Sequence, residues 1–134
     1  MNTLLHTLSK DHFNWPVWEK LIEKNGVTID RPYQSAHPKH PSIIYPINYG
    51  YINNTLSSDD EEVDIFIGTA SNKLVAAIIT TDFRKGDTEW KLIYNCTPEE
   101  IYLVNGFINY APDLMTGRLL MRQPMRTLWL TDIP

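Results

Sequence analysis

The sequence predicts a mainly β protein of the α+β class: a small five-stranded, OB-like barrel with flanking N- and C-terminal helices. Two observations support this fold class. Short segments rich in β-branched and aromatic residues follow one another along residues 27–95, and polar turns separate them. Helical signals occur on either side of this region, at residues 14–26 and from residue 97 onward. Short consecutive strands with a helix at each end favour a barrel with the helices packed outside it.

The size of the chain limits the number of domains. It has 134 residues, of which 43% are hydrophobic, and this suits one domain with a modest core. We therefore expect a single domain over residues 1–134. Its parts would be an N-terminal helical segment at 1–26, the barrel at 27–95, and a C-terminal helix and tail at 97–134.

Charge and cysteine content exclude several classes of protein. A net charge of −4 argues against general binding to nucleic acid, which requires a basic face. The single cysteine, Cys96, leaves no intrachain disulfide framework and is expected to be inert. The N-terminus lacks the layout of a signal peptide, and no run approaches the roughly 20 apolar residues of a membrane helix. We expect a cytoplasmic protein with neither nucleic acid nor membrane as a partner.

Both helices are predicted from the residues at their ends. Asn14 is a typical capping residue, and Gly26 is a typical residue for the end of a helix. Thr97 and Glu100 have the spacing of a capping box, which predicts a second helix at about 98–110.

The strands are predicted from β-branched and aromatic content. The loop between the first two, residues 31–46, holds four of the nine prolines and is expected to be ordered but irregular. Residues 117–134 carry no clear pattern. The predicted strands are 27–30, 48–53, 63–69, 73–83 and 89–95.

A run of four acids, residues 59–62, precedes the strand that contains Asp64. Such a run is usually a solvated turn, and this interpretation stays open. Two like charges about 4 Å apart cost about 1 kcal/mol in water and about 4 kcal/mol at an effective dielectric constant of about 20, so converging carboxylates need a counter-charge. Carboxylate donors without clustered Cys or His favour Mg²⁺, Mn²⁺ or Ca²⁺ over zinc.

A second acidic group lies at one end of a predicted hairpin and includes Asp82, Asp87 and Glu89. Glu89 and Lys91 are two residues apart, so on a strand they share a face. Next to the first acidic group, this pair would add a cation for an anionic substrate. The alternative is a charged hairpin tip with an ion pair of little energetic importance.

Two motifs resemble the signature of the soluble, metal-dependent inorganic pyrophosphatases. They are YPINYGYINNTL at residues 45–56 and DDEEVDIF at residues 59–66, and they keep the spacing of the family's tyrosines and acids. The resemblance implies that the three motif carboxylates are Asp59, Glu61 and Asp64. It also implies an OB-like barrel and hydrolysis of pyrophosphate by metal-activated water, with a related phosphoanhydride as the alternative substrate.

Other parts of the sequence are also similar to the family, but fewer of their residues match. Thr81-Asp82 followed by Glu89 and Lys91 matches a family arrangement of acids and a lysine. The family also has an arginine before the first motif tyrosine. Arg31 can take that place only if the proline-rich loop folds back.

The resemblance implies a role for each residue, with Mg²⁺ as the cofactor and Mn²⁺ as the alternative. Glu61 would orient or deprotonate the attacking water, with Tyr49 and Lys91 as further catalytic residues. The metal ligands would be Asp59, Asp64, Asp82 and Glu89, and the substrate would be bound by Arg31, Lys39, Tyr45, Tyr49 and Lys91.

The sequence also departs from the family pattern. Asp60 and Glu62 stand where the family has Gly and Pro, and Tyr110 is followed by Ala111 where the family has lysine. A second hypothesis is therefore a non-catalytic pyrophosphatase-like barrel that binds metal, phosphate or another protein. A homo-oligomer is open under both hypotheses. His37 and His40, in the proline-rich loop, are expected to be surface or packing residues.

Overall fold

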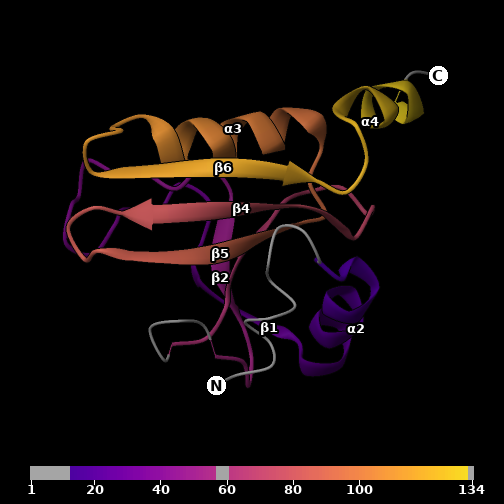
Figure 1. Cartoon of the computed structure of the whole chain (residues 1–134), viewed down its shortest axis with the longest axis horizontal. Helices are drawn as coiled ribbons and strands as arrows, with labels where there is room; N and C mark the ends of the chain where they lie inside the picture. The colour runs from indigo at the N-terminus through magenta and orange to yellow at the C-terminus, as the bar shows by residue number, and fades with distance from the viewer. Residues whose placement is uncertain (1–12, 57–60, 133–134) are drawn as a thin grey trace.

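Figure 1 shows the computed structural model of the chain, which describes residues 13–56 and 61–132. Its helices and strands are α2 (Trp15–Asn25), β1 (Val27–Arg31), β2 (Asn48–Ile52), β3 (Asp64–Ile67), β4 (Leu74–Asp82), β5 (Asp87–Tyr94), α3 (Pro98–Asn109), β6 (Met115–Met121) and α4 (Met125–Asp132).

The strands form one six-stranded sheet in the order β1-β2-β3-β5-β4-β6. The pair β3 and β5 is parallel, and every other neighbouring pair is antiparallel. The predicted fold class, mainly β with flanking helices, is confirmed. Within the described residues, however, β1 and β6 do not pair with each other, so the sheet is open rather than closed into a five-stranded barrel.

The sixth strand comes from the segment that sequence patterns left unassigned. Strand β6 lies along β4 over its whole length, from Met115 opposite Asp82 to Met121 opposite Ala76. Its sequence, MTGRLLM, has little β-branched content, so pairing with β4 and cover by α3 decide its structure rather than local preference. The predicted C-terminal helix and tail are therefore a helix, a strand and a further helix.

Hydrophobic clusters cover both faces of the sheet. Along β5, Leu92 belongs to the cluster under α2, and Ile93 belongs to the cluster under α3. Strand β3 alternates in the same way, with Ile65 on the α2 side and Phe66 on the α3 side, as the two-residue repeat of a strand requires. Trp90 packs on the α2 side, so it lies on the face of β5 opposite to Ile93.

The predicted helix caps are confirmed. The Asn14 side chain accepts a hydrogen bond from the Val17 backbone at 3.2 Å, and α2 ends at Gly26, whose φ is 74°. At the start of α3, the Glu100 backbone donates to the Thr97 hydroxyl at 3.2 Å, and the Thr97 backbone donates to the Glu100 carboxylate at 2.9 Å. Two of the backbone donors at this helix end are therefore satisfied by side chains.

The proline-rich loop folds back on itself. Ala36 and Ile44 form a β-bridge, the Gln34 backbone donates to the Tyr45 carbonyl at 2.9 Å, and the Tyr45 backbone donates to the Ser35 carbonyl at 3.0 Å. This hairpin brings its far end beside the end of β1.

One carboxylate joins α2 to the start of β4 and to the residue just after β6. Glu19 of α2 accepts hydrogen bonds from the Leu74 backbone at 3.2 Å and from the Arg122 guanidinium at 2.8 Å. Arg122 also donates to the Leu74 carbonyl at 3.1 Å. Glu19 and Arg122 are both less than a third exposed, so the link is sheltered from water.

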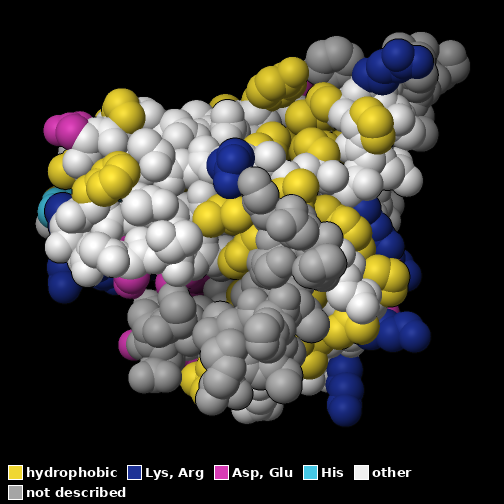
Figure 2. Space-filling model, in the orientation of Figure 1, with side chains coloured by type: hydrophobic (Ala, Val, Ile, Leu, Met, Phe, Trp, Pro, Cys, Tyr) yellow, Lys and Arg dark blue, Asp and Glu magenta, His cyan; other side chains and the backbone are white. Residues whose placement is uncertain are grey.

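Figure 2 shows where side chains of each type gather on the visible face. Hydrophobic side chains gather between α2 and α4, and Lys and Arg side chains lie along the same edge, whereas most of the visible Asp and Glu side chains lie on the left, where β4 ends and β5 begins. Within the described ranges, no helix combines the length and the apolar character needed to cross a bilayer.

Candidate active site

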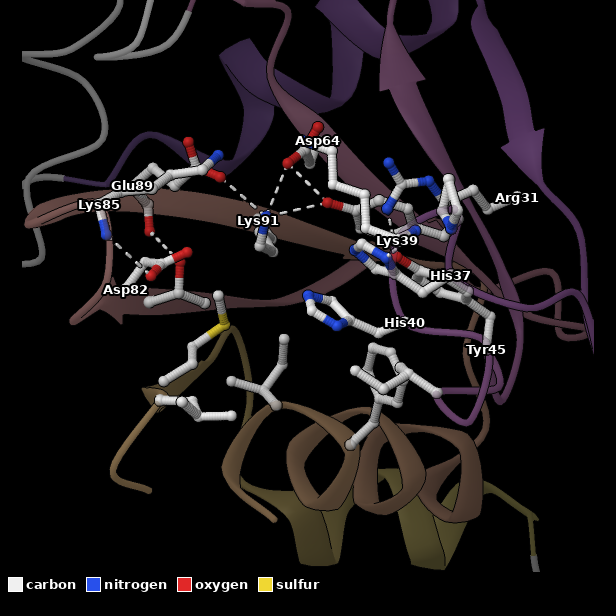
Figure 3. A pocket seen from close by; sticks show the side chains of 18 of the residues that line it. Arg31, His37, Lys39, His40, Tyr45, Asp64, Asp82, Lys85, Glu89 and Lys91 are labelled. Atoms are coloured by element: carbon white, nitrogen blue, oxygen red, sulfur yellow. Dashed lines mark hydrogen bonds and ion pairs between the residues drawn. The ribbon is translucent and has the colours of Figure 1, made fainter. Parts of the chain in front are cut away.

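A cavity of about 840 Å³ opens beside the sheet on the face that α3 covers. Its polar lining comes from strands β1 to β5, the proline-rich loop and the β4–β5 turn, and its apolar wall includes Phe107 of α3 and Met115 of β6. Figure 3 shows labelled polar side chains in a row along the sheet, with α3 on the opposite side of the cavity. Every site residue predicted from the sequence within the described ranges lines this cavity: Arg31, Lys39, Tyr45, Tyr49, Glu61, Asp64, Asp82, Glu89 and Lys91.

One predicted metal ligand, Asp59, lies outside the described residues. The other motif acids reach the cavity by different routes. Asp64 is the first residue of β3, and Glu61 lies three residues before it in the segment that enters the strand. Glu62, Asp87 and Asp30, for which no role was predicted, also line the cavity.

Lys91 is the centre of the hydrogen-bond network. Its ammonium lies 2.6 Å from the Asp64 carboxylate, 2.8 Å from the Glu89 carboxylate and 2.9 Å from the Tyr49 hydroxyl. Figure 3 shows these contacts as dashed lines converging on Lys91. The expectation that Glu89 and Lys91 share a face is confirmed, and Asp64 joins them because it is the register partner of Lys91 in the parallel pair.

Lys91 keeps its positive charge despite being only 6% exposed. Burial by itself would lower its pKa, but the contacts with Tyr49, Asp64 and Glu89 outweigh burial and raise the pKa well above its ordinary value. The cavity therefore holds a fixed cation between two carboxylates.

Tyr49 links this lysine to the acids. Its hydroxyl donates to the Asp64 carboxylate at 2.6 Å and accepts from Lys91. Burial and the charge of Asp64 raise the pKa of Tyr49 above its ordinary value, so the phenol keeps its proton and remains a donor.

Arg31 lies over the two motif tyrosines. Its guanidinium donates a short hydrogen bond to the Tyr45 hydroxyl and lies 5.5 Å from the Tyr45 ring centre and 5.8 Å from that of Tyr49. The two rings stack at 5.2 Å. This arrangement forms because the proline-rich loop folds back. Arg31 needs this fold-back to take the place of the family's arginine, as the sequence predicts.

The turn after β4 fixes Asp82. Its carboxylate accepts from the backbone amides of Arg84 at 3.0 Å and of Lys85 at 3.2 Å, and it is 7% exposed. Two amide donors hold one carboxylate oxygen in place, so the turn presents Asp82 to the cavity in a fixed orientation.

Sequence reasoning missed two residues at the mouth of the cavity, His40 and Arg84. The Arg84 guanidinium lies 3.2 Å from Nε2 of His40, although the two are 44 residues apart in the chain. His40 is exposed, as expected of a surface residue, but it also lines the cavity. No local motif marks either residue, since their meeting depends on how the loop folds back.

The acidic side chains of the cavity have the chemistry to bind a hard cation, but they do not form a complete set of metal ligands. Their donors are carboxylate oxygens, which Mg²⁺ and Mn²⁺ prefer. Among the residues that the structure describes, no group of three His, Cys, Asp or Glu side chains is close enough together to hold a metal. Lys91 supplies the positive charge between Asp64 and Glu89 instead.

Comparisons with known proteins point to one protein family. The family model for inorganic pyrophosphatase matches residues 23–102. The inorganic pyrophosphatase of Yersinia pestis is 57% identical over 47 residues, which are 35% of this chain and 23% of that protein. That of Haemophilus ducreyi is 40% identical over 47 residues, with the same two shares. The matched segment therefore spans less than a quarter of these relatives.

Solved structures show the same fold. The inorganic pyrophosphatase from Neisseria gonorrhoeae aligns with a TM-score of 0.58 and 14% identity, over 82% of this chain and 91% of the other. That from Coxiella burnetii aligns with a TM-score of 0.55 and 13% identity, over 80% of this chain and 91% of the other. At such low identity, the likeness is one of fold.

Proposed function

The chain belongs to the inorganic pyrophosphatase family, and we propose that it hydrolyses inorganic pyrophosphate to two phosphate ions. The observation that carries the proposal is the meeting, in one cavity, of Asp64, Glu89, Tyr49 and Lys91 with Arg31. Pyrophosphate is an anion that is bound together with a divalent cation. The basic side chains of the cavity can bind the anion, and its carboxylates can bind the cation. Phosphoryl transfer asks the protein mainly for positioning and for electrostatic stabilisation.

We propose Asp59, Asp64, Asp82 and Glu89 as the residues that would hold Mg²⁺, with Mn²⁺ as the alternative. A bound divalent cation lowers the pKa of water and neutralises phosphate oxygens. The carboxylate oxygens that line the cavity match this preference for hard donors.

The remaining proposed roles belong to side chains of the chain itself. Lys91 stays charged at neutral pH and can donate to a phosphate oxygen while Asp64 and Glu89 fix its position. Arg31 and Lys39 would bind phosphate oxygens through their positive charges. The Tyr45 and Tyr49 hydroxyls would hold Arg31 and Lys91 in place by hydrogen bonds. Glu61, which lines the same cavity, would orient the water and accept its proton.

The test is phosphate release from pyrophosphate in the presence of Mg²⁺ or Mn²⁺. Asp64→Asn should reduce the rate by about 10- to 100-fold or more. Asp113→Asn makes the same chemical change at an exposed position that does not line the cavity, and it should leave the rate unchanged. A wild-type protein that releases no phosphate with either metal would contradict the proposal.

The second candidate function is a non-catalytic module that binds pyrophosphate. One observation favours it: Lys91 already compensates the charges of Asp64 and Glu89. This candidate requires pyrophosphate binding without phosphate release, so a binding titration beside the rate assay separates the two functions. Cytoplasmic location, a single domain, and the absence of nucleic acid and membrane partners remain predictions from the sequence.

A further inference from the structure

Five basic residues that line the cavity come from two segments, and we call them the basic rim: His37, Lys39 and His40 of the proline-rich loop, and Arg84 and Lys85 of the β4–β5 turn. Only Lys39 has a proposed role in the function above. The rim joins two segments that are far apart in the chain, at the contact between His40 and Arg84.

This contact has an unusual pair of partners. The Arg84 guanidinium can only donate, so at 3.2 Å it is Nε2 of His40 that accepts. A neutral imidazole is a weaker partner for a guanidinium than a phosphate oxygen, which accepts charge-assisted and often bidentate hydrogen bonds.

The backbone that carries the pair is ordered on both sides. In the proline-rich loop, the Ile43 backbone donates to the His40 carbonyl at 2.9 Å, and the His40 backbone donates to the His37 carbonyl at 3.3 Å. In the turn, the Arg84 backbone donates to the Asp82 carboxylate at 3.0 Å. Both side chains are therefore presented to the cavity by fixed segments, with solvent access at Arg84, whose side chain is 50% exposed.

The charges next to the pair are mostly positive. Asp82 is an acid beside Arg84, 3.8 Å from its Nε, whereas the contact with His40 is made by the terminal nitrogen. Arg84, together with Lys39 and Arg31, also lowers the pKa of His37, after the larger effect of burial. Figure 3 shows the His40 ring between the row of labelled polar side chains and the side chains next to α3. An anion that extends from Lys91 toward the mouth of the cavity would meet this rim.

We propose that His40 and Arg84 form a second phosphate subsite, which binds the phosphate group of pyrophosphate that is not held by Lys91 and Arg31. The pair exchanges its mutual hydrogen bond for hydrogen bonds to this group. It thereby makes the cavity select a diphosphate over a single phosphate. The inference rests on the proposed function, because it assigns the second half of the same substrate.

The experiment measures binding rather than turnover, so its outcome does not depend on hydrolysis. Imidodiphosphate, a diphosphate with a nitrogen bridge that resists hydrolysis, and inorganic phosphate are each titrated into the protein with Mg²⁺ present. Arg84→Gln should weaken imidodiphosphate binding by about ten- to hundredfold and leave phosphate binding unchanged. His40→Gln should act in the same direction with a smaller effect.

The matched control is Arg118→Gln, an exposed arginine of β6 that does not line the cavity. It removes the same charge and should leave both affinities unchanged. Thermal unfolding of each variant checks that the fold is intact. Equal losses for imidodiphosphate and phosphate, equal losses in Arg84→Gln and Arg118→Gln, or a lower melting temperature with unchanged affinity would overturn the subsite. If the wild type binds imidodiphosphate but releases no phosphate from pyrophosphate, the proposed hydrolysis is wrong. The binding titrations of the variants still decide whether the subsite exists.

Discussion

The ammonium of Lys91 lies 2.6 Å from the carboxylate of Asp64, and the two residues are register partners in the parallel pair of β3 and β5. The backbone pairing of two central strands thus fixes an ion pair at the floor of the cavity. Because Glu89 lies on the same face of β5, one cation serves two carboxylates.

Lys91→Gln should lower the free energy of unfolding by about 3 kcal/mol, because it leaves two carboxylates without a counter-charge in a poorly solvated site. Urea unfolding at pH 7 measures the loss. Lys73→Gln is the control: it breaks an exposed ion pair with Glu23, and its cost should be much smaller, because water screens this pair. Similar losses in the two variants would contradict the importance assigned to the buried cation.

The same variant predicts a change in the response to metal. Without Lys91, a divalent cation is the available counter-charge for Asp64 and Glu89, so Mg²⁺ should raise the melting temperature of Lys91→Gln more than that of the wild type. The measurement is a thermal scan with and without Mg²⁺, with NaCl added to equal ionic strength. Equal shifts in both proteins would argue against a cation site at these two carboxylates.

The raised pKa of Lys91 predicts the pH dependence of its contribution to stability. A group whose pKa is raised on folding stabilises fully below its unfolded value, which is 10.5 here, and loses that contribution as pH rises through the folded pKa. The difference in unfolding free energy between wild type and Lys91→Gln should therefore be constant from pH 7 to pH 9 and shrink only above pH 10.5. If the difference already declines between pH 7 and pH 9, the result would be inconsistent with the raised pKa of Lys91.

Glu100 predicts the opposite pH dependence at the start of α3. Burial opposes its charge, but hydrogen bonds from Thr97 and Thr69 outweigh burial and lower its pKa below 4.5. Glu100→Ala should cost about 1–2 kcal/mol at pH 7. This cost is fully present above pH 4.5 and shrinks as pH falls through the folded pKa. Glu99→Ala, at the exposed neighbouring position, should cost much less in the same urea titrations.

Two glycines offer a matched pair of alanine substitutions. A Cβ at Gly50 of β2 would lie 1.9 Å from the Thr28 carbonyl oxygen, so Gly50→Ala must push β1 away from β2 and disturb both Tyr49 and Arg31. A Cβ at Gly106 of α3 meets nothing within 4 Å. Gly106→Ala should therefore stabilise by up to about 1 kcal/mol, through helix preference. Thermal unfolding and pyrophosphate binding measure both variants, and a Gly50→Ala protein with wild-type values of both would refute the close approach.

The expected inertness of Cys96 can be tested by thiol labelling. Burial, followed by the charge of Glu100, raises the pKa of its thiol to about 12, and the residue is fully buried. At pH 8 the native protein should react with a thiol reagent only after unfolding, so urea should increase the rate sharply. Rapid labelling of the folded protein would show that the thiol is accessible.

The sequence predicted those features of the site that depend on short-range spacing. Glu89 and Lys91 share a face because strands repeat every two residues, and Thr97 with Glu100 caps a helix because of their spacing. The family resemblance carried Asp64 and Tyr49, which the structure brings into contact. Each of these predictions needed only local geometry or a motif of fixed spacing.

The remaining features depend on contacts between distant segments. Arg31 reaches Tyr45 because the proline-rich loop turns back, and His40 reaches Arg84 for the same reason. Strand β6 forms because β4 offers it an unpaired edge. The residues of β6 alone do not predict a strand. Closure of the predicted barrel failed for a related reason: with β6 on that edge, the sheet extends beyond the five predicted strands.

The carboxylate of Glu19 has a mechanical consequence. It binds the backbone at the start of β4 and the guanidinium of Arg122 just after β6, so one side chain of α2 holds both strands at this edge of the sheet. The link therefore resists separation of α2 from β4 and β6.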